Sequence, residues 1–112
     1  MDSGKSKTIN TVLIGVGRIG FSFENDVLRK KPASHLGALR HLGEFINTTA
    51  ICDIDQNKLT AATNWFAVNN EFLTEPFLKT NSYREAINTH PDLIVIATPP
   101  ETHFDIIKYT CS

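Results

Sequence analysis

The chain has 112 residues, of which 41% are hydrophobic and 21% are charged, and its formal net charge is −1. This length suits a single domain, and the composition is too apolar for a disordered chain. The 11 basic and 12 acidic residues leave no charge excess that would indicate binding to nucleic acid or to an anionic membrane. No apolar run reaches the length of a membrane span, and the polar start "MDSGKSKT" does not resemble a signal peptide.

The two cysteines, Cys52 and Cys111, form no CxxC motif and are too few for a disulfide framework. This usage is typical of a reducing compartment, so we expect a cytoplasmic protein. Residues 1–7 are expected to be a disordered tail, and residues 8–112 to form the domain. No metal site is expected.

Strand and helix patterns alternate from the start of the domain. "TINTVLIGVG" predicts a strand that enters a glycine turn, and a helix is expected to open at residues 18–23. The charged segment 24–34 interrupts this helix and is interpreted as an insertion loop. Helical spacing resumes in "SHLGALRHL", with Ser34 as a candidate cap. A second strand, rich in β-branched residues, is expected within residues 45–55.

The second half of the chain continues the alternation. A helix is expected over residues 56–68, and residues 71–81 leave a short third strand open. Ser82 and Glu85 form the spacing of a capping box for another helix. The apolar run in "DLIVIATP" predicts a strand that is covered on both faces, and helical spacing returns from Glu101.

This order predicts a Rossmann-type, doubly wound α/β fold, in which a parallel sheet lies between two helical layers. Ligands of such sheets bind beyond the carboxyl ends of the strands. Three candidate strand ends are therefore "GVGRIG", "CDID" and "ATPPETH".

The sequence "GVGRIG" has the glycine spacing of a dinucleotide-binding turn, and it lies between a predicted strand and a helix. Gly15 permits the sharp turn, Gly17 allows close approach of a pyrophosphate, and Gly20 allows the helix to pack on the sheet. The amides of Arg18 and Ile19 are expected to face the anion. A glycine turn used only for packing is the alternative.

A dinucleotide site also requires an acid at the end of the second strand to bind the ribose hydroxyls. We assign this role to Asp53, and we assign Asp55 to capping the next helix. Asp53 lies 33 positions after Gly20, against about 20 in the usual pattern, and the insertion accounts for roughly that excess. The carboxylate would repel a 2′-phosphate, which favours NAD over NADP as cofactor.

The third strand end contains two consecutive prolines, which stiffen the turn into the last helix. From the residues alone, His103 is interpreted as a structural histidine that bonds this turn.

The chain resembles the N-terminal domain of the Gfo/Idh/MocA family of NAD(P)-dependent oxidoreductases, which are similar to glucose–fructose oxidoreductase and inositol dehydrogenase. The resemblance rests on "VLIGVGRIG", "AICDID", and "YREAI" before "PDLIVIATPPETH", and it covers residues 8–112. The A-T-P-x-x-x-H element after a buried strand is its most specific part. The long loop after Gly20 departs from the commonest family pattern.

The resemblance implies that Ala97, Thr98 and Pro99 lie against the nicotinamide end of the cofactor and that His103 braces them. The predicted cofactor-binding residues are then Gly15, Gly17, Arg18, Ile19, Gly20, Asp53, Ala97, Thr98, Pro99 and His103. It also implies hydride transfer between nicotinamide and a sugar, polyol or related hydroxyl compound.

Family members carry a Glu-Lys-Pro motif with a catalytic lysine and a second, substrate-binding domain, and this sequence contains neither. We therefore assign no catalytic residue and expect a sugar or polyol partner only for a full-length enzyme. Two alternatives stay open. One is a stand-alone nucleotide-binding module, and the other is an interaction domain without activity. Homo-oligomerisation through an uncovered sheet edge also stays open.

Overall fold

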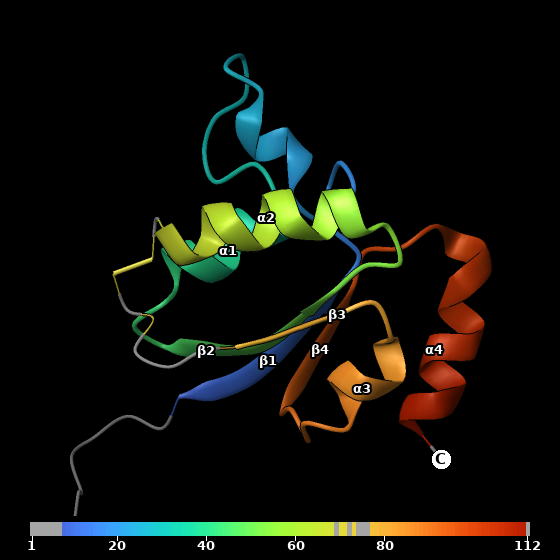
Figure 1. Cartoon of the computed structure of the whole chain (residues 1–112). Helices are drawn as coiled ribbons and strands as arrows, with labels where there is room; N and C mark the ends of the chain where they lie inside the picture. The colour runs from blue at the N-terminus through green and yellow to red at the C-terminus, as the bar shows by residue number, and fades with distance from the viewer. Residues whose placement is uncertain (1–7, 69, 72, 74–76, 112) are drawn as a thin grey trace, which may run out of the picture.

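The computed structural model describes residues 8–68, 70, 71, 73 and 77–111. Its elements confirm the predicted Rossmann-like α/β order (Figure 1). In chain order they are β1 (Ile9–Ile14), η1 (Ser22–Asn25), α1 (His35–His41), β2 (Ile46–Cys52), α2 (Gln56–Val68), β3 (Leu78–Thr80), α3 (Tyr83–Ile87), β4 (Leu93–Ile96), η2 (Pro100–Thr102) and α4 (His103–Thr110).

The four strands form one parallel sheet in the order β3-β2-β1-β4. Helices α1 and α2 cover one face, and α3 and α4 lie on the other (Figure 1). Alternate residues of β1 supply the two cores: Leu13 packs with the α1–α2 layer and Val12 with the α3–α4 layer. Both side chains are fully buried, as expected for a central strand.

The sheet has two edge strands among the described residues, β3 and β4. The short β3 falls in the segment whose structure the sequence left open, part of which (residues 72 and 74–76) lies outside the described residues. As predicted, β4 packs on both faces, with Val95 against the α1–α2 core and Ile94 and Ile96 against the α3–α4 core, but it is not deeply buried. Leu93 is 44% exposed and the rest of the strand is half-buried, because β4 pairs only with β1 in the described sheet.

The first helix also differs from its prediction. Residues 18–21 form a turn, η1 follows, and α1 begins only at His35. Nevertheless, the amides of His35 and Leu36 donate to the carbonyl oxygens of Ile19 (2.8 Å) and Gly20 (2.9 Å). These bonds replace the ones that a continuous helix makes to the residue four positions earlier.

The positions of these bonded residues give the length of the insertion. His35 lies sixteen positions after Ile19 instead of four, so twelve residues are extra. Without them, the separation of 33 positions between Gly20 and Asp53 falls to 21, close to the usual value of about 20. The inserted residues therefore lie outside the helical path, and the spacing between Gly20 and Asp53 without them matches the usual dinucleotide-binding pattern.

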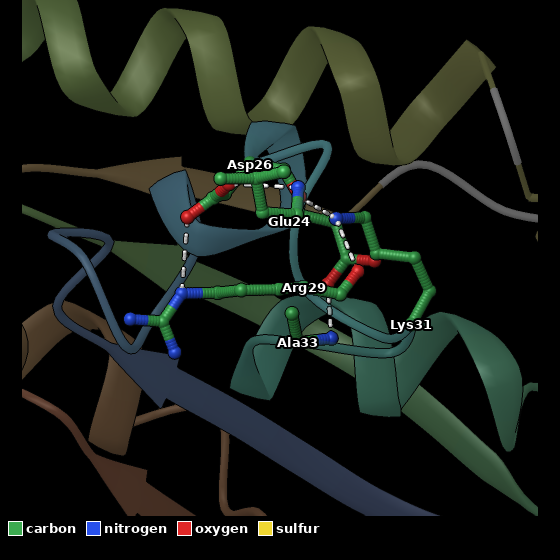
Figure 2. Close-up of polar contacts among 6 residues, drawn as sticks. Glu24, Asp26, Arg29, Lys31 and Ala33 are labelled. Atoms are coloured by element: carbon green, nitrogen blue, oxygen red, sulfur yellow. Dashed lines mark hydrogen bonds and ion pairs between the residues drawn. The ribbon is translucent and has the colours of Figure 1, made fainter.

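The base of the insertion is held by Glu24, whose side chain is buried (Figure 2). Its Oε1 accepts from the Ala33 amide (3.0 Å) and from the Ser34 hydroxyl (2.7 Å). The Ser34 oxygen in turn accepts from the Gly37 amide (3.0 Å), which confirms Ser34 as the cap of α1. The Glu24 carboxylate thus connects the beginning of the insertion to its end and to the first residue before α1.

The tip of the insertion is organised by Asp26. Its carboxylate accepts from the Leu28 amide (2.9 Å) and from Arg29 Nε (3.2 Å), and its carbonyl oxygen accepts from the Lys31 ammonium (Figure 2). The Leu28 amide, and beyond it Arg29, lower the pKa of Asp26. Two of the three consecutive basic side chains are therefore directed to oxygens of their own loop.

We predict that Glu24→Ala lowers the free energy of unfolding by about 1–3 kcal/mol, because the Ala33 amide and the Ser34 hydroxyl would lose their acceptor in a buried position. Urea unfolding measures this effect. Glu44→Ala, at an exposed glutamate before β2, is the control and should change the value by less than about 0.5 kcal/mol. Equal effects of the two substitutions would show that Glu24 does not hold the insertion.

Candidate functional site

The carboxyl ends of β1, β2 and β4 meet at Gly15. The Gly15 amide donates to the carbonyl oxygen of Cys52 (2.7 Å), and the Ala97 amide donates to that of Ile14 (2.7 Å). Gly15 has φ +104°, which residues with a side chain rarely adopt. A Cβ on Gly15 would also lie 2.7–2.9 Å from the backbone of Ala97 and Thr98. Only glycine permits both the turn and this approach.

The other two glycines of the turn have opposite surroundings. A Cβ on Gly20 would overlap the carbonyl oxygen of Gly15, so Gly20 is required for the turn to fold back on itself. A Cβ on Gly17 would meet no atom within 4 Å. The space beside Gly17 is therefore open, as the predicted approach of a pyrophosphate requires.

The backbone amides of the turn are divided into two groups. Those of Val16, Phe21 and Ser22 are bonded, the first to Asp53 and the other two to the carbonyl oxygen of Gly17. Within the described part of the chain, the four amides of residues 17–20 have no hydrogen-bond acceptor. Gly20 is buried, whereas Gly17, Arg18 and Ile19 are half-buried or exposed. Consecutive free amides at the start of a helical turn form a binding arrangement for an anion, and here the first three are accessible. The Arg18 side chain is exposed, and Ile19 is 48% exposed.

Asp53 lies at the end of β2 and connects two turns. Its Oδ2 accepts from the Val16 amide (2.8 Å) and its Oδ1 from the Asp55 amide (2.8 Å). Each carboxylate oxygen has a second lone pair, so the half-buried group can still accept from a ligand hydroxyl. Asp55 caps α2, as predicted, by accepting from the amides of Asn57 (2.9 Å) and Lys58 (3.2 Å).

Asn81, at the end of β3, is a further candidate site residue that no sequence motif indicates. Asn81 Nδ2 donates to the carbonyl oxygen of Asp53 (2.9 Å), and the Asp53 amide donates to that of Thr80 (3.2 Å). These bonds fix Asn81 beside Asp53. A polar residue directly after a possible strand was the only available signal.

The turn after β4 is stabilised by side-chain hydrogen bonds from the residues that follow it, Thr102 and His103. His103 Nε2 lies 2.7 Å from the carbonyl oxygen of Thr98, and because a carbonyl only accepts, Nε2 carries the proton. The Thr102 hydroxyl lies 2.6 Å from that of Thr98 and 2.8 Å from the carbonyl oxygen of Pro99. The half-buried His103 therefore supports the turn, as the residues alone predicted.

Cys52, at the end of β2 beneath the site, has a buried and unreactive thiol. Burial, and after it the charges of Asp53 and Glu85, raise the pKa of its thiol from 9.0 to about 12. Its side chain is 2% exposed, whereas Cys111 is exposed. Because the thiolate is the reactive form, the structure assigns no nucleophilic role to Cys52.

A parallel α/β sheet whose first strand ends in this glycine turn, with an acid at the end of the second strand, defines a Rossmann-type dinucleotide-binding domain. The family model of the oxidoreductase family with the NAD-binding Rossmann fold, Gfo/Idh/MocA, matches residues 9–111. The chain belongs to this family. A search of curated proteins finds no match. Among the helices in the described ranges, none is both long and apolar enough to cross a membrane.

We predict that substitution by alanine has different effects on stability at Gly17 and at Gly20. Gly20→Ala should lower the free energy of unfolding by more than about 2 kcal/mol, because its Cβ meets backbone. Gly17→Ala should leave it unchanged or raise it by less than about 1 kcal/mol, because the site is open and its φ is ordinary. Urea unfolding of both variants gives the comparison. Similar stabilities would contradict the described packing of the turn.

We predict that iodoacetamide modifies only Cys111 in the folded chain at pH 8, and both cysteines in urea, as read by intact mass. A thiol pKa raised by folding stabilises the folded state below the ordinary value of 9.0, and this stabilisation is lost as the pH rises toward about 12. Stability should therefore fall above pH 9, and Cys52→Ala should remove that part of the fall. Rapid modification of Cys52 at pH 8 would contradict its burial.

Proposed function

We propose that this chain binds NAD across the carboxyl edge of its sheet, as the cofactor-binding portion of an oxidoreductase that acts on a sugar, polyol or related hydroxyl compound. The observation that carries the proposal is the row of amides at Gly17, Arg18 and Ile19, which have no acceptor among the described residues and lie at half-buried or exposed positions beside the Asp53 carboxylate. The amides suit a pyrophosphate, and the carboxylate suits ribose hydroxyls.

The sheet order arranges the remaining contacts. The turn of Ala97, Thr98 and Pro99 follows β4, on the side of β1 opposite to β2. A dinucleotide with its pyrophosphate over the end of β1 and its adenosine ribose at β2 therefore extends its nicotinamide half toward this turn. His103 positions the turn by bonding the Thr98 carbonyl oxygen.

The charges at the ribose end favour NAD over NADP. A 2′-phosphate would approach the carboxylate of Asp53 and that of Asp55 two residues later, and no cation occupies the turn between them. Arg29 and Lys31 of the insertion are bound to oxygens of their own loop, which leaves them poorly placed to neutralise such a phosphate.

When bound, the nicotinamide supplies the hydride acceptor. The residues of this chain hold and orient the cofactor, and none of them is assigned the transfer of the substrate proton. A positioned acid or base contributes about 10²–10⁴-fold to a rate. Because the sequence contains no Glu-Lys-Pro motif, we propose that the 112-residue chain by itself binds cofactor without useful turnover.

Calorimetric titration tests the proposal. We expect NAD to bind at least about tenfold more tightly than NADP, and Asp53→Ala to weaken NAD binding by about tenfold or more, because two charge-assisted hydrogen bonds to ribose would be lost. Asp92→Ala is the matched control, since Asp92 also accepts from a backbone amide, that of Asn10 (3.0 Å), but at the amino edge of the sheet. The control should bind NAD normally.

Two results would overturn the proposal. If the folded chain bound neither dinucleotide, the cofactor role would fail. If NADP bound more tightly than NAD, the assignment of the ribose end would fail. Reduction of NAD by the chain with a polyol panel would contradict the expected lack of turnover.

A further inference from the structure

Asn81 has a fixed orientation at the end of β3. Its nearest partner, the carbonyl oxygen of Asp53, can only accept, so the group 2.9 Å away must be the amide nitrogen of Asn81. The side-chain amide is planar, with its oxygen and nitrogen on opposite sides. The bond to Asp53 therefore turns Oδ1 away from Asp53. No described residue donates to this oxygen, and the side chain is exposed.

The order of the strands relates Asn81 to the proposed cofactor. Strand β3 pairs with β2 on the side away from β1. With the pyrophosphate over the end of β1 and the adenosine ribose at the end of β2, the next group of the dinucleotide, its purine base, extends toward the end of β3. Asn81 is the residue that directly follows β3.

We propose that the Asn81 Oδ1 accepts a hydrogen bond from the 6-amino group of adenine and so selects adenine over 6-oxopurines. This inference rests on the proposed binding of NAD. A carbonyl oxygen held in one orientation discriminates between an amino group, which donates, and an oxo group, which only accepts.

A second feature at the same edge suits a purine. Ile54, between Asp53 and Asp55, is 88% exposed although it is aliphatic. Asp53 fixes this turn through its bond to the Asp55 amide, and Asn81 fixes the carbonyl oxygen of Asp53 on the other side. The ends of β2 and β3 thus present an apolar side chain and an oriented acceptor, which are complementary to the face and the edge of the base.

The test compares NAD with nicotinamide hypoxanthine dinucleotide, in which an oxo group replaces the 6-amino group. We expect the wild-type chain to bind NAD roughly fivefold more tightly, the size of one lost hydrogen bond at an exposed site. Asn81→Leu should remove this preference. Asn81→Asp should keep it, because a carboxylate oxygen also accepts from the amine.

Asn47→Leu is the matched control. Asn47 also donates its side-chain amide to an oxygen of a neighbouring residue, Asn10 Oδ1 at 3.1 Å, but it lies at the amino end of β2. This variant should retain the wild-type preference for NAD.

The outcomes separate this inference from the function on which it rests. If the wild-type chain bound both dinucleotides equally, Asn81 would not read the base, although the cofactor role would stand. If Asn81→Leu weakened both ligands by the same factor, Asn81 would only support Asp53, and the inference would be wrong. If neither dinucleotide bound the wild-type chain, both the proposed function and the inference would fail.

Discussion

The close approach of the strand ends at Gly15 is the constraint on which the rest of the site depends. The chain must leave β1 with φ +104° while its backbone lies against Ala97 and Thr98, and only glycine satisfies both conditions. That approach places the turn after β4 next to the turn after β1. The bond from the Asp53 carboxylate to the Val16 amide then attaches the end of β2 to the same point. Three turns from distant parts of the sequence thereby form one edge.

The sequence predicted the parts of this edge that local chemistry determines. The glycines follow an apolar strand, Asp55 follows the next strand at the position of a helix cap, and the strand–helix alternation implies a parallel sheet. Each of these features depends on residues within a few positions of one another. The family match over residues 9–111 agrees with the resemblance drawn from the same motifs.

The features that the sequence did not predict all depend on contacts between distant residues. The insertion after the first turn was predicted, but no local pattern indicates that the amides of His35 and Leu36 bond to the carbonyl oxygens of Ile19 and Gly20 and so close it. The apolar run of β4 predicts packing on both faces, which the strand has, but its partial exposure is set by its place at the edge of the described sheet. Asn81 becomes a candidate site residue only when Asp53 lies beside it.

The most direct test of cofactor binding at the glycine turn is a map of amide chemical shifts of the labelled chain during titration with NAD. We predict that the largest changes occur at residues 15–20, at Asp53 and in the turn after β4. The amides of Asn10, Asn47 and Asp92, at the opposite edge of the sheet, should not move. Changes that cluster at the opposite edge, or that omit residues 17–20, would contradict the central claim that this glycine turn receives the cofactor.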